Sequence, residues 1–348
     1  MAMYSATDGL PNDFHLVHLG ARALGGAALV FGEMTCVSPD ARITPGCLGL
    51  WNDEQAAQWK RIVDFVHRAD AGEIRHPVGP RRPQGRDRAS PGRAWTSRSP
   101  CSAWPLISAS ALPYLPQSQT PRAMERADMD RVVADFVAAT KRAAATGADW
   151  LELHCAHGYL LSSFLSPLTN KRADEYGGDH EGPREIPARS LQGCARKLAG
   201  GQADVRAPVL LTTGTTAGNA PEDAAIFAAM FKEAGADLVD CSAGQVTKDE
   251  QPVYGRMFQT PFSDKIRNEV GIATIAVGAI SELDQANSII GAGRADLCAV
   301  ARPHLADPAW LLHEAAKLGV ADLVWPKQYL SGKMQFEAGL QRAATAAK

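Results

Sequence analysis

The sequence lacks the features that mark membrane, secreted and nucleic-acid-binding proteins. No apolar run approaches the roughly 18 residues that a membrane-spanning helix needs. The opening stretch MAMYSATDGLPNDFH has no basic segment followed by an apolar one, as a secretion signal would. The formal net charge is only -2, which gives no electrostatic reason to expect nucleic acid or an anionic membrane as partner. We therefore expect a cytoplasmic protein that acts on small molecules, with assembly into a homo-oligomer left open.

Paired cysteines are also missing. The chain has 7 cysteines, but no two of them form a C-x-x-C pair. This scatter is typical of reduced thiols and argues against a disulfide framework or a zinc knuckle. At 348 residues the chain is long enough for one large α/β domain or two smaller ones.

What the sequence does contain is a regular alternation of apolar strand-like runs and helical patterns, which favours a closed (β/α)₈ TIM barrel. Strands are predicted at 27–34, 104–110, 149–154, 237–243, 273–279 and 296–301, and helices at 128–146, 221–235, 262–270 and 282–292. The expected strands end at or just before residues that chemistry could use, and active sites of such barrels lie at that rim. These residues are Glu33, His154, Ser242, Gly278 and Arg302.

Two windows interrupt this alternation. Residues 75–101 are crowded with Arg, Pro, Ser and Gly, and residues 179–216 are similarly unpatterned although a helix and a strand are due there. Composition predicts flexible loops in both windows. Structureless loops of that length inside a compact barrel are themselves evidence against the assignment.

The most informative segment runs from Glu152 to Gly178, ELHCAHGYLLSSFLSPLTNKRADEYGG. His154 and His157 are three residues apart at a strand end, so both imidazoles could donate hydrogen bonds to one substrate oxygen. An isolated H-x-x-H can also be a pair of packed or capping histidines. A zinc site is a further alternative, although no third ligand is obvious nearby.

With its flanking residues, this segment resembles the signature of the Old Yellow Enzyme family, in which His-x-x-His or His-x-x-Asn precedes GYL, FLSP and EYGG. The resemblance implies an FMN-binding barrel over residues 1–325, a C-terminal extension over 326–348, and NADPH or NADH as reductant. It assigns His154 and His157 to the electron-withdrawing group of an activated alkene. Tyr159 would supply the proton, and Tyr4 would contact the substrate.

The resemblance also assigns positions around the flavin. Gly278 would allow close backbone approach and Arg302 would pair with the FMN phosphate, although alone they would be a turn glycine and a surface cation. Met34 and Ala301 are assigned to the same site. Ala2 replaces the cysteine with which a relative tunes its flavin, so thiol tuning is not expected. No segment corresponds to the family's first strand and its Ser-Pro, so we expect a barrel that lacks this strand.

A narrower resemblance lies at the C-terminal end. The stretch WPKQYLSGKMQFE is similar to the reductase part of bifunctional enzymes that hydroxylate and reduce aryl-CoA thioesters such as anthraniloyl- or salicylyl-CoA.

The two anomalous windows can be explained by shifts of reading frame. Codons permitted for Arg75 to Gly85, reread one base later, can encode GIQLGHAGRK, and those for Pro91 to Ser99, reread two bases later, can encode WEGMDEPL. Codons permitted for Arg184 to Ala207, reread one base later, can encode ARFPLEVFKAVRESWPADKPMSVR. These restore the glutamine, the His-Ala-Gly-Arg run and the arginine that the resemblance places beside the flavin. We hypothesise frameshifts in the gene or in its sequencing.

The sequence thus predicts an FMN-dependent oxidoreductase that passes hydride from NAD(P)H to an activated alkene. Two alternatives stay open. One is a frameshift-damaged barrel without flavin, and the other is a metal-dependent barrel lyase or hydrolase that uses His154 and His157 as ligands.

Overall fold

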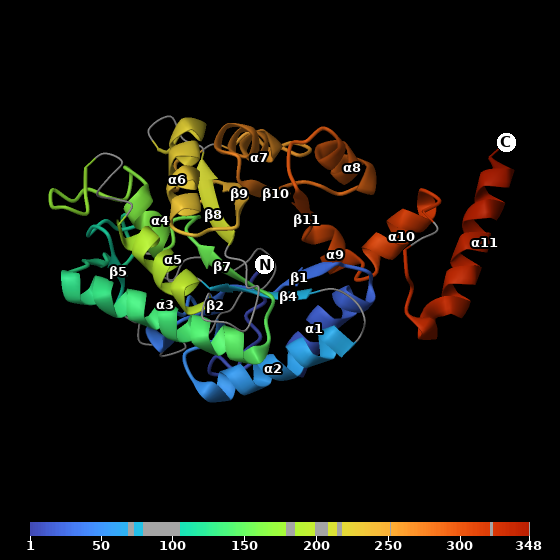
Figure 1. Ribbon diagram of the computed structural model, residues 1–348, viewed down its shortest axis with the longest axis horizontal. Helices are drawn as coiled ribbons and strands as arrows, with labels where there is room; N and C mark the ends of the chain where they lie inside the picture. Colours follow the sequence, from blue (N-terminus) through green and yellow to red (C-terminus); the bar gives the residue numbers. More distant parts are fainter. Residues whose placement is uncertain are drawn as a thin grey trace.

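The computed structural model describes residues 1–68, 73–78, 105–178, 185–198, 208–213, 218–250, 252–320 and 323–347. A ring of parallel strands forms its centre, and helices surround the ring (Figure 1). The strands are β1 (Leu29–Phe31), β2 (Thr35–Cys36), β3 (Leu48–Gly49), β4 (Glu73–Val78), β7 (Trp150–His154), β8 (Pro208–Thr213), β9 (Leu238–Ala243), β10 (Ala273–Val277) and β11 (Leu297–Ala299). The longer helices are α1 (Asp13–Leu24), α2 (Asp53–Arg68), α3 (Arg126–Thr146), α5 (Glu185–Leu198), α6 (Pro221–Glu233), α8 (Leu283–Gly291), α10 (Trp310–Lys317) and α11 (Leu330–Ala346).

The strands follow the order β11-β10-β9-β8-β7-β4, and both β1 and β2 pair with β4 while β3 pairs with β2. Every pair is parallel; Val209, for example, lies beside Leu153 of β7 and Val239 of β9. Parallel pairing places all carboxyl ends on one rim of the ring. The fold is that of the (β/α)₈-barrel class, as the alternation predicted.

Helix α3 shows why the predicted helices form. Its buried residues, among them Met129, Val132 and Phe136, recur every three or four positions and pack into the main hydrophobic core. Each such buried side chain contributes about 1.5–3 kcal/mol. The helix ends where Gly147 adopts a left-handed conformation with φ 83°. The expected helix at 128–146 is therefore confirmed, two residues longer at its start.

The predicted strands and helices downstream are confirmed as β7, α6, β9, β10, α8 and β11, each shortened at one or both ends. The helix expected at 262–270 begins as α7 (Thr260–Lys265) and continues as a π-helical turn, η3 (Ile266–Val270). The strand expected at 104–110 is wrong as a barrel strand. It contains β5 (Ile107–Ser108), which pairs only with β6 (Arg122–Ala123) in a separate two-stranded sheet within the described residues.

The prediction of loops in the two windows is also wrong where the structure describes them. Strand β4 enters the first window and lies between β1 and β7. Helix α5 and strand β8 occupy the second, with β8 between β7 and β9. Pairing with neighbouring strands overrides the local composition. Residues 79–101 of the first window lie outside the described residues.

Helices, rather than strand pairing, join the two ends of the ring. Within the described residues no ladder connects β1 to β11. Instead, Arg22 of α1 donates to the carbonyl of His304 in α9 (Arg302–Ala306), with its Nε at 3.1 Å and its second terminal nitrogen at 2.8 Å. Gly25 lies directly against Pro308 at the start of α10. The missing first strand stays a prediction.

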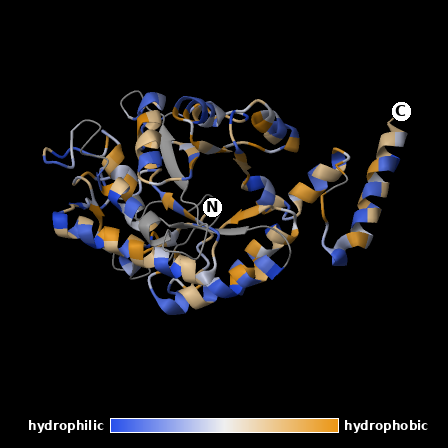
Figure 2. Cartoon of the chain, in the orientation of Figure 1, coloured by the Kyte–Doolittle hydropathy of each residue, from blue (hydrophilic) through white to orange (hydrophobic). Residues whose placement is uncertain are grey.

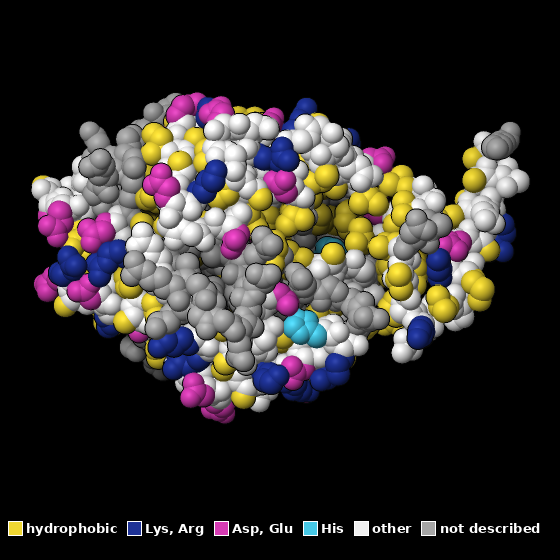
Figure 3. All heavy atoms as spheres, in the orientation of Figure 1, with side chains coloured by type: hydrophobic (Ala, Val, Ile, Leu, Met, Phe, Trp, Pro, Cys, Tyr) yellow, Lys and Arg dark blue, Asp and Glu magenta, His cyan; other side chains and the backbone are white. Residues whose placement is uncertain are grey.

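The C-terminal helix stands apart from the ring in Figure 1, and none of its described residues is buried. It follows η4 (Lys327–Tyr329) and carries exposed apolar side chains such as Met334, which is 66% exposed. Figure 2 shows hydrophobic and hydrophilic residues alternating along it, and Figure 3 shows hydrophobic side chains gathered beside α10. Among the helices described, none combines the length and apolarity needed to cross a bilayer.

The contact between α1 and α10 predicts a specific sensitivity. A Cβ at residue 25 would lie 2.0 Å from the Pro308 carbonyl oxygen, so Gly25→Ala forces the two helices apart. We expect a loss of about 1–3 kcal/mol in the free energy of unfolding, measured by urea titration. The control is Gly339→Ala in α11, where a Cβ meets nothing within 4 Å and helix propensity improves. Equal unfolding midpoints for the two variants would show that the contact between Gly25 and Pro308 does not stabilise the fold.

Candidate functional site

The histidine pair sits at the carboxyl end of β7. His154 is the last residue of this strand and is only 7% exposed. His157 and Gly158 follow in left-handed conformations, with φ of 58° and 72°. This turn brings His157 back over the strand end, so that its Nδ1 lies 3.4 Å from His154 Nε2. A non-glycine residue such as His157 adopts this backbone only where its surroundings impose it, which is common at functional sites.

Tyr159 completes a cluster of three rings. Its ring packs edge-on against His154, with 4.7 Å between centroids, and the two histidine rings are 5.2 Å apart. Tyr159 also precedes α4 (Leu160–Leu165), whose residues are all buried. The structure therefore brings together the three residues that the sequence assigned to oxygen binding and proton donation.

A hydrogen-bond chain continues from this pair to the next strands. His157 Nε2 lies 2.8 Å from Ser242 Oγ on β9. The Ser242 hydroxyl donates to Gln259 Oε1 at 3.3 Å. That amide oxygen also accepts from Ala243 N at 2.6 Å, and Gln259 Nε2 donates to Val277 O at 2.8 Å. Gln259 thereby ties the carboxyl end of β9 to that of β10.

Sequence reasoning missed Gln259 entirely. It noted Ser242 as a strand-end residue but gave it no role. Gln259 lies in the loop segment before α7, where neither periodicity nor a motif marks a polar residue as special. Its burial, with 4% exposure, is visible only once the chain is folded.

Glycine is needed at residue 278, just after β10, for a structural reason besides the predicted close approach of a cofactor. Its φ is 111°, and a Cβ there would lie 2.5 Å from Gln259 Nε2. Ala301 and Arg302 follow the neighbouring strand β11, and both are exposed at the start of α9. The rim beside β10 and β11 thus includes the backbone of Gly278, which carries no side chain, and the exposed Arg302, whose guanidinium suits a phosphate group.

A third group forms around Glu33, just after β1. Its carboxylate accepts from Met3 N at 2.8 Å and lies 3.5 Å from His15 Nε2. This bond ties Met3, which lies between Ala2 and Tyr4, to the residue that precedes Met34 in the chain, and Met34 is 8% exposed. Tyr4 has a positive φ of 54° and is 41% exposed. The predicted residues of the N-terminal segment therefore share one place on the rim.

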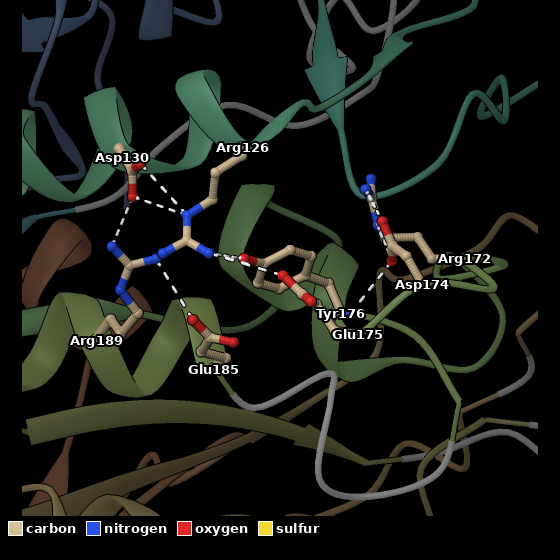
Figure 4. A network of polar contacts seen from close by, with 8 residues as sticks. All are labelled: Arg126, Asp130, Arg172, Asp174, Glu175, Tyr176, Glu185 and Arg189. Atoms are coloured by element: carbon tan, nitrogen blue, oxygen red, sulfur yellow. Dashed lines mark hydrogen bonds and ion pairs between the residues drawn. The ribbon is translucent and has the colours of Figure 1, made fainter.

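The EYGG part of the signature has a structural role. Tyr176 is 3% exposed, and the guanidinium groups of Arg126 and Arg172 each lie 5.8 Å from its ring centroid. Arg172 donates to the carbonyls of Ala109 and Met124, which fastens this loop to the ends of β5 and β6. Figure 4 shows Arg126 directed toward Tyr176, and Arg172 directed toward Asp174. The network fixes the segment that follows the histidine pair.

A buried acid on β9 lies below the site. Asp240 on β9 is two residues before Ser242, so both side chains point to the same face of the strand. Burial raises the pKa of this carboxyl group to about 7. Its Oδ1 has no hydrogen-bond partner among the described residues.

The thiols match the expectation of reduced cysteines where they are described. Six cysteines are free, five of them buried, and Cys101 lies outside the described residues. Hydrogen bonds from Cys36 and Thr44 lower the pKa of the Cys47 thiol to about 7.

Comparisons with known proteins show the family to which the chain belongs. Residues 1–319 match the model of the NADH:flavin oxidoreductase / NADH oxidase family. An NADPH dehydrogenase of Listeria monocytogenes serotype 4a is 38% identical over 94% of this chain and 92% of its own length. One of Geobacillus thermodenitrificans is 35% identical over 95% and 92%.

Solved structures share the fold. Morphinone reductase superposes with a TM-score of 0.72 at 24% identity, covering 92% of this chain and 84% of that one. A 2-naphthoyl-CoA reductase gives a TM-score of 0.77 at 19% identity, covering 93% and 50%.

The raised pKa of Asp240 predicts a pH dependence of stability. The pKa of this carboxyl group is near 7 in the folded chain and has its ordinary, lower value in the unfolded chain. Below the pKa of the unfolded chain the group makes its full contribution to the free energy of unfolding, and this contribution is lost as pH rises through 7. Asp240→Asn keeps the shape but cannot ionise. We expect the difference in urea unfolding midpoint between variant and parent to grow in favour of the variant from pH 4 to pH 8. A constant difference across this range would show that Asp240 titrates normally.

Proposed function

Because the chain belongs to the NADH:flavin oxidoreductase / NADH oxidase family, we propose that it reduces activated alkenes with hydride that passes from NADPH or NADH through FMN. The single observation that carries this proposal is the cluster of His154, His157 and Tyr159 at the carboxyl end of β7. The resemblance to the Old Yellow Enzyme family is confirmed by the matched family model.

The residues around β10 and β11 would hold the cofactor. Arg302 would pair with the phosphate, and the backbone at Gly278 would approach it closely. Ala301 lies next to Arg302, and Met34 and Ala2 would flank the ring. Bound FMN supplies a hydride acceptor and donor that no side chain can replace.

The histidine pair would bind the carbonyl oxygen of the substrate. Ala156 N donates to His154 Nδ1 at 3.2 Å, so the neutral ring carries its proton on Nε2, the nitrogen that faces His157. A donor at this position withdraws electron density from the alkene and stabilises charge that develops on the oxygen. Tyr159 would deliver a proton to the carbon next to the carbonyl, and Tyr4 would contact the substrate.

The relatives support the substrate class. The names NADPH dehydrogenase, morphinone reductase and 2-naphthoyl-CoA reductase describe NADPH use and reduction of a ketone-bearing or CoA-linked compound. An aryl-CoA-derived intermediate is the narrower candidate that the C-terminal stretch supports. Cytoplasmic location, a homo-oligomeric state, and the division into a barrel over 1–325 and an extension over 326–348 belong to the same proposal.

The frameshift hypothesis gains support from the position of β4. This strand has paired neighbours on both sides, a position where parallel barrels favour near-continuous apolar runs. Its residues EIRHPV include Pro77, which has no N–H for a ladder. The reread residues GIQL would suit the position and restore the glutamine. As a separate point, the first strand that the family resemblance implies would lie between β1 and β11, where the described residues form no ladder.

Two other functions remain as alternatives. If the written windows abolish flavin binding, the chain is a damaged barrel. The metal-dependent lyase or hydrolase has less support, because the described residues contain no group of three or more His, Cys, Asp or Glu arranged to hold a metal.

If the histidines bind the substrate oxygen, removing one of them should slow oxidation of the flavin by the enone but not reduction of the flavin by NADPH. In the FMN-loaded chain, His154→Ala should lower kcat/KM for cyclohexenone about 10- to 100-fold, the effect of one lost hydrogen bond to developing charge. Reduction of the flavin by NADPH, followed by stopped-flow absorbance, should change less than threefold. The control His67→Ala removes an exposed histidine that pairs with Asp149, just before β7 and at the opposite end of that strand from His154. Unchanged reoxidation by the enone in His154→Ala would refute the assignment.

The frameshift hypothesis predicts a difference between two chains. One carries the written sequence, and the other carries the three reread stretches. After incubation with FMN and gel filtration, the restored chain should retain flavin absorbance, and the written chain should bind FMN at least about tenfold more weakly because it lacks hydrogen bonds to the ring. Equal retention would count against the hypothesis, as would resequencing that finds no insertion or deletion in the locus.

A further inference from the structure

The hydrogen bonds around His157 form one continuous chain with a defined direction. At one end, Ala156 N–H donates to His154 Nδ1 at 3.2 Å, which leaves the proton of the neutral ring on Nε2. That Nε2 lies 3.4 Å from His157 Nδ1, so His157 Nδ1 accepts. His157 must then carry its own proton on Nε2, which lies 2.8 Å from Ser242 Oγ.

The other end is also fixed by backbone groups. Ser242 Oγ donates to Gln259 Oε1 at 3.3 Å. Gln259 cannot turn its amide over, because Oε1 accepts from Ala243 N at 2.6 Å while Nε2 donates to Val277 O at 2.8 Å. Gly278 leaves the space that this side chain needs, since a Cβ there would lie 2.5 Å from Gln259 Nε2. Three backbone groups therefore set which nitrogen of each histidine ring is protonated. They are Ala156 N after β7, Ala243 N on β9 and Val277 O on β10.

This arrangement conflicts with the way in which the pair would bind an oxygen. In the state described, His157 uses its only N–H toward Ser242 and presents an acceptor toward His154. For both rings to donate to one substrate oxygen, the proton of His157 must lie on Nδ1, and Ser242 must donate to Nε2. In this change the His157 ring gives its Nε2 proton to water and takes a proton from water at Nδ1, while the Ser242 hydroxyl rotates toward Nε2 and exchanges its bond at 3.3 Å for one at 2.8 Å. Gln259 Oε1 keeps the bond from Ala243 N throughout.

We propose that Ser242, held by Gln259, is a positioning residue whose hydroxyl direction decides which ring nitrogen of His157 carries the proton. With the site empty, Ser242 accepts from His157. With an oxygen ligand between the histidines, Ser242 donates to His157 and makes Nδ1–H available to the ligand. This inference rests on the proposed function for the second state only, because the first state is a property of the chain alone.

The test reads the tautomer directly. In chain labelled with ¹⁵N-histidine, long-range ¹H–¹⁵N correlations distinguish a ring protonated on Nε2, on Nδ1 or on both. The parent, without substrate, should show His157 protonated on Nε2. Gln259→Met removes the acceptor for the Ser242 hydroxyl and should move the proton of His157 to Nδ1. Ser242→Ala should leave His157 as a mixture of tautomers, whereas Ser242→Thr keeps the hydroxyl and should restore the parent signal.

A matched control separates this role from general damage. Ser288→Ala removes a hydroxyl that donates to Gln285 O within α8 and should leave His157 unchanged. The unfolding midpoint of each variant is measured, so that a changed His157 signal is not mistaken for a loss of structure. If Gln259→Met does not fold, the comparison of Ser242→Ala with Ser242→Thr tests the proposal. A parent His157 protonated on Nδ1, or a Ser242→Ala spectrum identical to that of the parent, would overturn the proposal.

Kinetics in the FMN-loaded chain give the second readout. Ser242→Ala should lower kcat/KM for cyclohexenone about tenfold while flavin reduction by NADPH stays unchanged, and Ser242→Thr should recover most of the loss. Should no variant, nor the parent, turn over an enone, the proposed function fails, and the tautomer of the empty site still decides the role of Ser242.

Discussion

The parallel register of the strands is the constraint on which the rest of the structure depends. Because β4, β7, β8, β9, β10 and β11 run in one direction, their carboxyl ends meet on one rim. Residues far apart in the sequence, such as His157 and Ser242, then come within 2.8 Å. A slip of one residue between β8 and its neighbours would move Ser242 away from the histidine pair. Gln259 locks this rim by joining the ends of β9 and β10 through three backbone and hydroxyl groups.

Strain and buried polarity concentrate at the same rim. Tyr4, His157 and Ala279 have positive φ although none is glycine. Asp240 lies just beneath, with its pKa raised by burial. Such features cost stability and persist only where surrounding contacts impose them. Here the buried α3 face and the Tyr176 network hold the outer layer, while the helices α1 and α10 meet across the ends of the ring. The outer layer thus provides the rigidity that the polar rim needs.

The parts of the fold that sequence could predict are those with a local signal. The 3.6-residue spacing from Met129 to Ala143 predicted α3, and the apolar run before His154 predicted β7. By contrast, β4, α5 and β8 were not predicted, because their local composition gives no period and their strand partners lie elsewhere in the chain. Gln259 could not be found from sequence for a related reason. Its function arises from contacts with β9 and β10, and its loop carries no motif.

The positions of the two anomalous windows determine which contacts of the site they alter. Both fall on the neighbours of β7, since β4 lies on one side of it and β8 on the other. The contacts that orient His157 lead the other way, through Ser242 and Gln259 to β9 and β10. Of the residues that the family resemblance places beside the flavin ring, the glutamine would fall in β4, and the arginine would fall just before β8, outside the described residues. Ala2 and Met34, which the resemblance also assigns to the flavin, lie outside both windows. We therefore propose that a chain with the written windows keeps the geometry of the histidine pair and of the rim at Gly278 and Arg302 while it loses hydrogen bonds to the flavin ring. On this proposal flavin retention and histidine geometry are separable properties, because they depend on different parts of the barrel.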